Sequence, residues 1–441
     1  MRTTTPAAAL LRTALPAAAL LLGATANAQQ PSFPPAAEAD PARLGLMQGA
    51  PVPPDKQVRW DNGSMWAFPK TRWAFSNLQA LTPTVPVARG TGPASPLPKA
   101  LRTDIDSIPV TLPDGRRISW ADSFDLHYSD AIVVLHKGRI VHERHGATLG
   151  PDGRHLAMSV TKSFVGTLAQ LLIHEGKLDE TRTVASYIPE LANAGFGAAT
   201  VRQVLDMRTA VAFNEDYAGT GLTDATRMGI AAGWAPPPPG FKGPDGTYAF
   251  VASIGPAGAH GGDFVYRTPN TTVLQWIVER VGGAPLATQL ADRIWKPMGM
   301  EQEASIGVDR IGTVFGGGAM NANIRDFARF GEMIRQGGKW NGRQILPPAV
   351  VKTILTPGNP AAFANTKYPG LDGGSYKGQW WYRATGQTMA VGIHGQLIYI
   401  DPKAQLVVAR FASFPVATNR AIHPTTLPAI DALAAHLSKD R

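Results

Sequence analysis

The chain has 441 residues, 44% of them hydrophobic and 17% charged, which is enough to bury a sizeable core in one large or two joined domains. It contains no cysteine, so disulfides, thiol catalysis and cysteine-ligated metals are excluded. The formal net charge is +9, but the basic residues are scattered. We attribute this charge to solubility and expect no nucleic-acid partner.

Residues 1–28 have the pattern of a secretory signal peptide. Arg2 and Arg12 supply positive charge, residues 14–22 form an apolar core, and Ala26-Asn27-Ala28 is a small-residue cleavage site. The apolar run is too short for a membrane span, and no later stretch approaches twenty apolar residues. The sequence therefore predicts a periplasmic or secreted protein without a membrane span.

Residues 29–100 are rich in proline and glycine and carry few apolar repeats. We expect an extended segment that wraps around the rest of the protein, anchored by a set of aromatic side chains: Trp60, Trp66, Phe68, Trp73 and Phe75. The alternative is a disordered linker, which fits residues 29–55 better than the aromatic part.

Two hairpins are predicted at opposite ends of the remaining chain. Strand-like runs at 131–136 and 139–145 flank Lys137-Gly138, a two-residue turn signal. The second hairpin joins residues 391–400 to residues 405–411.

The middle of the chain is mainly helical up to about residue 290. Helical spacing is clear at Val201–Met207 and Val273–Val281. A loop from about 234 to 262 interrupts this region, and a loop of that length is usually functional or disordered.

Two further helices follow. Asp326–Gln336 has Asn323 as a possible cap and ends at Gly337-Gly338. A last helix runs from Leu427 to about Leu437.

Strands at both ends and helices between them indicate an α+β fold. We expect an antiparallel sheet covered by terminal helices, with an all-helical domain inserted between its strands. Residues 101–165 and 291–441 form the predicted sheet domain, and residues 166–290 form the helical domain.

The only Ser-x-x-Lys in the chain is Ser159-Val160-Thr161-Lys162, at the start of an amphipathic helix that stops at Gly176. Residues three apart share a helix face, so the hydroxyl and the amine can meet. A lysine with a lowered pKa can take the proton of a serine hydroxyl and make it nucleophilic. The alternative is a serine near a helix N-cap with a solvated lysine.

Other chemistries have weaker support. His142 and His145 do not have the spacing of a His-Glu-x-x-His zinc site and would face opposite sides of a strand. No glycine-rich nucleotide loop opens a helix, and no Gly-x-Ser-x-Gly elbow is present. We therefore expect neither a metal nor another cofactor.

Three further positions could complete a hydrolase site. Tyr266 precedes a helix, and beside a lysine ammonium its pKa would fall towards a useful value. Tyr217 lies in a loop and could bond a substrate amide. His394-Gly395-Gln396 begins a strand whose edge offers free N–H donors. The alternatives are a core tyrosine, a surface tyrosine and a structural histidine, respectively.

Together these residues resemble the serine β-lactamase-related superfamily of the class C type, and in particular the 6-aminohexanoate-dimer hydrolases and their esterase relatives. The resemblance covers most of the chain from about residue 50 onward. The stretches that carry it are Phe68–Phe75, Met158–Ser163, Phe213–Tyr217, Arg325–Gly331, Gln379–Trp381 and Ile393–Gln396.

This resemblance implies a β-lactamase/penicillin-binding-protein-like fold with a cleft between the sheet and the all-α domain. It implies Ser159 as nucleophile, Lys162 as its base and Tyr266 as the group that protonates the leaving atom. Tyr217 would hold the leaving nitrogen. The backbone N–H of Ser159 and one near Gln396 or Leu397 would form the oxyanion hole.

Two departures from the superfamily pattern bear on the substrate. Its Tyr-x-Ser/Asn motif reads Tyr266-Arg267-Thr268 here, and its Lys-Thr-Gly motif reads His394-Gly395-Gln396. The missing lysine commonly binds the carboxylate of β-lactams, so efficient β-lactamase action is not expected.

The resemblance therefore implies a hydrolase of a small-molecule linear amide or small carboxylic ester. The alternatives are a D-amino-acid peptidase or carboxypeptidase, a weak β-lactamase, and a non-catalytic binding module. The sequence leaves the oligomeric state open.

Overall fold

The computed structural model describes residues 33–146, 149–217, 219 and 221–439. The predicted signal peptide at residues 1–28 lies outside them. Within the described residues, no helix is both long and apolar enough to cross a membrane.

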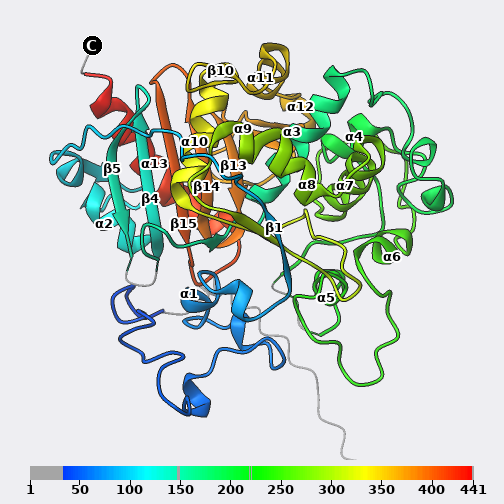
Figure 1. The fold of residues 1–441 in the computed structure, drawn as a ribbon, viewed down its shortest axis with the longest axis horizontal. Coiled ribbons are helices and arrows are strands. Elements are labelled where there is room, and N and C mark those ends of the chain that lie inside the picture. The colour runs from blue at the N-terminus through cyan, green and yellow to red at the C-terminus, as the bar shows by residue number, and fades with distance from the viewer. Residues whose placement is uncertain (1–32, 147–148, 218, 220, 440–441) are drawn as a thin grey trace, which may run out of the picture. The chain divides into compact units, whose positions relative to one another are not determined.

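The centre of the fold is an antiparallel sheet of seven strands (Figure 1). Its spatial order is β11-β12-β13-β14-β15-β4-β5. Strands β4 and β15 are therefore neighbours, although about 270 residues of chain separate them. The strands are β4 Ser129–His136, β5 Arg139–His145, β11 Ser375–Lys377, β12 Trp380–Tyr382, β13 Thr388–Gly392, β14 Gln396–Asp401 and β15 Leu406–Ala412.

Side chains along these strands alternate between two hydrophobic clusters, as the period of a pleated strand requires. On β15, Val407 and Ala409 face the cluster under α3 (Val160–His174) and α10 (Ile324–Arg335). Leu406 and Val408 face the opposite cluster, under α2 (Trp120–Leu126) and α13 (Asn419–Leu437). The sheet is therefore covered on both faces.

A helical region lies beyond α3 (Figure 1). Its helices are α4 Val201–Leu205, α5 Asp224–Ala231, α6 Thr247–Ala252, α7 Pro269–Gly282 and α8 Leu286–Leu290. Helix α7 packs against both α3 and α4, which joins the region to the helix that begins at Ser159. The remaining helices are α1 Thr71–Ala74, α9 Lys296–Met298, α11 Pro348–Leu355 and α12 Pro360–Phe363.

A second, four-stranded sheet has the order β1-β7-β8-β6. It combines β1 (Thr84–Val87) of the N-terminal segment with β6 (His155–Leu156), β7 (Ala304–Gly307) and β8 (Met320–Ala322). Two small hairpins complete the strands: β2 Pro109–Thr111 with β3 Arg117–Ser119, and β9 Lys339–Trp340 with β10 Arg343–Gln344. Strand β6 ends three residues before Ser159, so this sheet positions the start of α3.

The α+β class, the antiparallel sheet and the Lys137-Gly138 hairpin are confirmed. The predicted helix at 326–336 is also present as α10, with the Asn323 side chain accepting from Arg325 N. The proposed boundaries between sheet and helical domains stay predictions.

Three local expectations are wrong. Residues 391–400 are not one strand, because a turn at Ile393–Gly395 separates β13 from β14. The loop at 234–262 contains α6. The last helix begins at Asn419 rather than Leu427, despite two internal prolines. For residues 35–55 the alternative of a disordered linker does not hold, since Ala39 and Leu46 are buried and the Arg72 guanidinium donates to Ala36 O at 2.6 Å.

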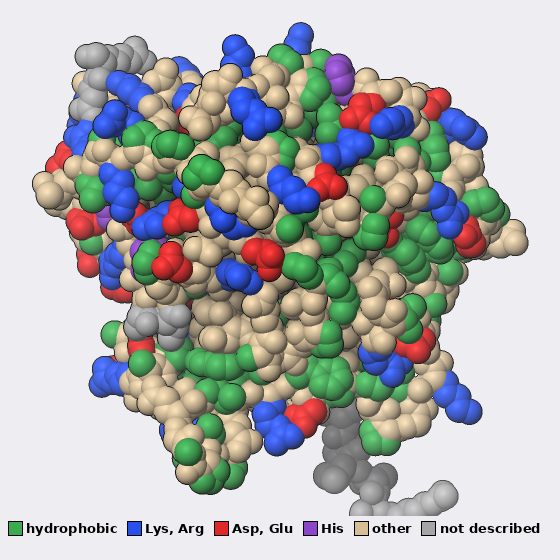
Figure 2. All heavy atoms as spheres, in the orientation of Figure 1, with side chains coloured by type: hydrophobic (Ala, Val, Ile, Leu, Met, Phe, Trp, Pro, Cys, Tyr) green, Lys and Arg blue, Asp and Glu red, His purple; other side chains and the backbone are tan. Residues whose placement is uncertain are grey.

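Figure 2 shows Lys and Arg side chains spread over one face among Asp and Glu, with no single basic patch on that face.

Candidate active site

Ser159 stands at the N-cap position of α3, directly after a residue with strained backbone. Met158 has φ +48°, which is uncommon for a side chain of its size and is often found at functional sites. Ser159 is partly exposed, whereas Met158 and Val160 are buried. Its side chain makes no capping bond. The Ser159 hydroxyl is therefore not used to cap the helix and stays accessible from solvent.

Lys162 lies one turn further along α3 and faces the same way. Its Nζ donates to Ser159 Oγ at 2.8 Å and also to the carbonyl of Gly317. The side chain is only 1% exposed. Burial lowers the pKa of Lys162 to about 8, although the nearby Glu215 carboxylate opposes this shift. A neutral amine within bonding reach of a hydroxyl is the arrangement that a serine nucleophile needs.

Gly317 makes room for this contact. A Cβ at this position would come within 2.7 Å of the Thr268 methyl group and 2.8 Å of the Phe315 ring. A side chain there would push these neighbours away from the lysine, so only glycine allows the carbonyl to sit against Nζ.

Tyr266 reaches Ser159 from the loop before α7. Its ring centroid lies 5.3 Å from Lys162 Nζ, and the nearby Ser159 side chain acts on the pKa of its phenol. The ring stacks on Trp381 with centroids 5.4 Å apart. The three side chains that the sequence analysis grouped as catalytic therefore lie together, although more than a hundred residues separate Tyr266 from the other two.

The expected direction of the Tyr266 pKa shift is wrong. Burial and the Glu215 carboxylate raise this pKa well above its ordinary value, and the nearby Ser159 side chain only partly offsets them. The lysine does not produce the predicted decrease. Tyr266 is consequently a neutral phenol near neutral pH, able to donate a proton and to pass one on.

Glu215 lies at the centre of this site, and the sequence analysis gave it no role. Its carboxylate accepts from Thr268 N and, at 2.7 Å, from Thr268 Oγ1. It also accepts from Tyr217 Oη at 2.6 Å. Thr268, which departs from the superfamily motif, thus binds a carboxylate here. The only sequence signal for Glu215 was its place in the Phe213–Tyr217 stretch.

Tyr217 lies at the same cleft with its ring 44% exposed. Desolvation and the Glu215 carboxylate raise its pKa well above the ordinary value, so the phenol keeps its proton. Arg267 fixes the preceding loop by donating to the carbonyls of Phe213 and Thr209 at 2.9 and 2.8 Å. The hydrogen bonds of Arg267 therefore hold the loop that places Tyr217 in the wall of the cleft.

His394 belongs to the turn between β13 and β14. Its Nδ1 lies 2.6 Å from the carbonyl of Phe414, and burial lowers its pKa to about 4. The imidazole is therefore neutral near neutral pH. The Nδ1 contact holds the turn against the segment after β15.

Gln396 and Leu397 open β14, and Gly395 precedes them. The buried Gln396 side chain donates to Ala412 O at 2.5 Å and accepts from Ala412 N at 3.1 Å. Leu397 pairs with Val391 and Arg410 in the sheet. The Gln396 amide is thus engaged by β15, and the oxyanion hole assigned to backbone N–H groups in this stretch stays a prediction.

The cleft at Ser159 is narrow, with a cavity volume of about 10 Å³. Its walls are mostly apolar or aromatic: Met158, Tyr217, Met228, Trp234, Thr268, Phe315, Gly317 and Ile393. Two tryptophans of the N-terminal segment support one wall. Trp66 Nε1 donates to Trp234 O at 2.8 Å, and Trp60 Nε1 donates to Gly233 O at 2.7 Å. The predicted anchoring role of this segment therefore extends to shaping the cleft.

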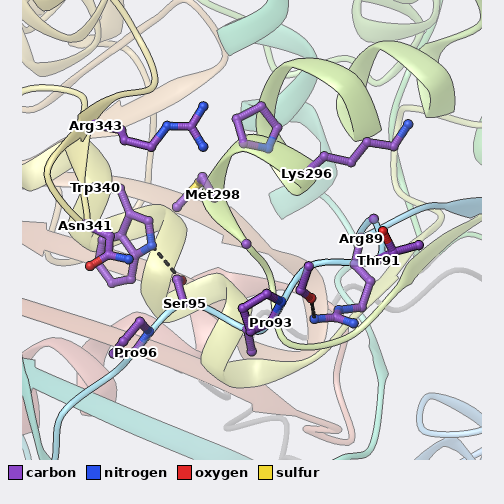
Figure 3. A pocket seen from close by; sticks show the side chains of 15 residues that line it. Arg89, Thr91, Pro93, Ser95, Pro96, Lys296, Met298, Trp340, Asn341 and Arg343 are labelled. Atoms are coloured by element: carbon purple, nitrogen blue, oxygen red, sulfur yellow. Dashed lines mark hydrogen bonds between the residues drawn. The ribbon is translucent and has the colours of Figure 1, made fainter.

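A larger hollow of about 440 Å³ lies elsewhere, between residues 89–96 and 296–299 (Figure 3). It contains Arg89, Lys296 and Arg343, but its one serine is engaged, because Ser95 Oγ accepts from Trp340 Nε1 at 2.7 Å. It shares no residue with the Ser159 cleft and offers no paired nucleophile and base.

Comparison with known proteins agrees with this geometry. The Beta-lactamase family model matches residues 127–427, which include the serine, the lysine, both tyrosines and the turn at 393–395. The chain belongs to the beta-lactamase family. It is also 34% identical over 358 residues to the 6-aminohexanoate-dimer hydrolase of Paenarthrobacter ureafaciens, covering 80% of this chain and 88% of that protein.

Solved structures support the same fold. A Bacillus anthracis protein, provisionally assigned as a 6-aminohexanoate-dimer hydrolase, is 29% identical and superposes with a TM-score of 0.78 over 88% of this chain and 99% of its own. The hydrolase EstCE1 is 14% identical, with a TM-score of 0.56 over 71% of this chain and 98% of its own. At that identity the likeness to EstCE1 concerns the fold alone.

Proposed function

We propose that this member of the beta-lactamase family is a serine hydrolase that cleaves linear amides of the 6-aminohexanoate-oligomer type, or small carboxylic esters, through an acyl-enzyme on Ser159. The observation that carries the proposal is the contact of Lys162 Nζ with Ser159 Oγ at 2.8 Å, with the Tyr266 ring centroid 5.3 Å from the same Nζ. The relative from Paenarthrobacter ureafaciens favours the amide substrate.

In the proposed acylation, the neutral Lys162 amine takes the proton of Ser159 as Oγ attacks the substrate carbonyl carbon. Backbone N–H donors at the start of α3 and near Gln396 bind the oxyanion. The Tyr266 phenol then gives its proton to the leaving amine or alkoxide and regains one from the Lys162 ammonium. The bond to the leaving atom breaks, and the acyl group remains on Ser159.

Deacylation repeats these proton transfers with water in place of the serine. Lys162 is neutral again and, through Tyr266, takes a proton from the attacking water. Ser159 Oγ leaves and regains its proton. The products are the free acid and the enzyme in its starting protonation state.

The walls of the cleft indicate the kind of acyl group it accepts. They are apolar and aromatic, and none of the described lining residues is an arginine or lysine. His394, at the position of the superfamily lysine, stays neutral because burial lowers its pKa to about 4. Such walls suit a flexible alkyl chain and give no cationic partner to a substrate carboxylate.

The experiment that tests this function is a substrate panel for the purified protein. We expect measurable kcat/KM for 6-aminohexanoate dimer and for p-nitrophenyl butyrate. We expect values at least about 100-fold lower for nitrocefin and for D-alanyl peptides, because both carry a carboxylate on the carbon next to the scissile nitrogen, where neutral His394 leaves it unpaired. The carboxylate of the dimer lies five methylene groups from its amide nitrogen and can stay in solvent. Activity confined to D-alanyl peptides or nitrocefin would replace this proposal with a peptidase or β-lactamase.

A Tyr266→Phe variant tests the role of the phenol. An amine leaves only after protonation, whereas p-nitrophenolate leaves unassisted, so the two substrates should respond differently. We expect kcat to fall by about 10²- to 10⁴-fold for the amide and by less than about tenfold for the p-nitrophenyl ester.

The matched control for this variant is Tyr376→Phe, which alters a buried ring 6.2 Å from Tyr266 that also contacts Trp381. It should leave the amide-to-ester ratio unchanged. Equal losses on both substrates for Tyr266→Phe would mean that the phenol does not serve the leaving group.

We also propose that the protein acts outside the cytoplasm, because residues 1–28 have the pattern of a signal peptide.

A further inference from the structure

Arg410 is a buried cation without an acidic partner. It projects from β15 and is 5% exposed. Its Nε donates to Gly395 O and its Nη1 to Thr426 Oγ1, both at 3.0 Å. No carboxylate among the described residues forms an ion pair with it, and Nη2 has no hydrogen-bond partner there. Burial lowers its pKa to about 10, so the guanidinium still carries its charge near neutral pH.

Two other buried arginines each form an ion pair with a buried aspartate. Arg72 meets Asp130 at 3.1 Å, and Arg329 meets Asp326 at 3.0 Å. Burying a charge without a partner is costly, so buried charges are normally paired. The missing negative charge at Arg410 therefore requires an explanation.

The ionisable groups around Arg410 do not supply this charge. Burial, followed by the field of Arg410, lowers the pKa of His127 well below its ordinary value. The same two causes, together with Arg383, lower the pKa of His423 to about 3. Both imidazoles are therefore neutral. The described ionisable groups that respond to Arg410 are therefore neutral histidines, and the further charge acting on His423 is the cation Arg383.

A small cavity lies next to Arg410, between the sheet and helices α2 and α13. It has a volume of about 20 Å³, enough for one water-sized occupant. Its polar lining residues are Ser123, His127, Ser129, Arg410 and Thr426, and the rest of its wall is mainly apolar, including Phe124 and Leu397. Two buried donors on the lining residues, Ser129 Oγ and Trp120 Nε1, have no hydrogen-bond partner.

We propose that this cavity binds one chloride-sized monovalent anion, with Arg410 as its charge partner and the Ser129 hydroxyl as a neutral donor. An anion here would balance the buried guanidinium and satisfy a donor that is otherwise orphaned.

An anion bound at Arg410 would also affect the turn beside the Ser159 cleft. The guanidinium that faces the cavity holds the carbonyl of Gly395, and Gly395 leads directly into Gln396 and Leu397. An anion that fixes Arg410 would therefore steady the turn from which an oxyanion donor is expected. The anion site itself rests on Arg410 and the cavity, independently of the proposed hydrolase activity.

The test combines a crystal grown in sodium bromide with thermal unfolding in sodium chloride, sodium bromide and sodium gluconate at equal ionic strength. We expect an anomalous bromide peak within about 3.5 Å of Arg410 Nη2 and the Ser129 hydroxyl. We also expect the unfolding midpoint to rise by about 2–5 °C, saturably, with either halide and not with gluconate.

Variants separate this site from general salt effects. Arg410→Gln and Ser129→Ala should lose or weaken the halide-specific rise, and Ser129→Ala serves alone if the arginine variant does not fold. Arg343→Gln, which changes the arginine at the hollow of Figure 3, should keep the full rise. A water without anomalous signal in the cavity, or the same midpoints in halide and gluconate, would overturn the proposal.

Discussion

Replacing Ser159 by alanine is expected to lower kcat/KM by about 10⁵-fold or more for every substrate that the protein hydrolyses, because no other hydroxyl among the described residues is bonded to Lys162. The fold should be retained, since Ser159 makes no capping bond and is partly exposed. Initial rates and the thermal unfolding midpoint, measured on the same preparation, check both parts.

Ser163→Ala is the matched control. Ser163 is on the next turn of the same helix, is 1% exposed, and donates to Gln379 O at 2.7 Å. Its loss should destabilise the protein by about 1–3 kcal/mol while leaving activity within about tenfold. Residual hydrolysis by Ser159→Ala at more than about a hundredth of the original rate would reject the acyl-enzyme mechanism.

Lys162→Met is expected to reduce kcat/KM by about 10³-fold or more, because methionine fills the same buried space without a base. In the unaltered protein, kcat/KM should rise tenfold per pH unit and level off above about pH 8, where the lysine becomes neutral. kcat/KM falls as the pH falls because a protonated Lys162 cannot accept the serine proton. Measuring kcat/KM from acid to alkaline pH, for the unaltered protein and for Lys162→Met, tests both expectations.

The control here is Lys377→Met, since burial also lowers the pKa of Lys377 although it lines no part of the cleft. That variant should keep the same pH profile. If the residual activity of Lys162→Met still rose towards pH 8 with the same slope, the titrating group would be another residue.

The catalytic pair was predictable from sequence because it is local. Ser159 and Lys162 are three residues apart on one helix, and helix geometry alone brings their side chains to one face. The Lys137-Gly138 hairpin was predictable for a similar reason, as both residues adopt the positive φ that a two-residue turn needs. The fold class followed from the order of such local elements.

The protonation states depended on tertiary structure. Lys162 has a pKa of about 8 because residues from α3, the Gly317 loop and the Tyr266 segment exclude water from it. The pKa of Tyr266 shifts in the opposite direction to the one expected, because the fold buries the phenol and brings Glu215 near it from a distant loop. Burial and charge contacts of this kind are made across the chain, and no pattern of spacing reveals them.

The sequence by itself determined the proposed nucleophile, its neighbouring amine and the α+β class, because short-range geometry and hydrophobic periodicity fix these features. Only the tertiary structure decided the central place of Glu215, the turn that divides β13 from β14, and the support of the cleft by Trp60 and Trp66. The contact of Glu215 with Thr268 and those of the two tryptophans join segments far apart in the chain, and the turn is held by the contact of His394 Nδ1 with Phe414 O. The free energy that holds these contacts comes from packing and desolvation rather than from local propensity.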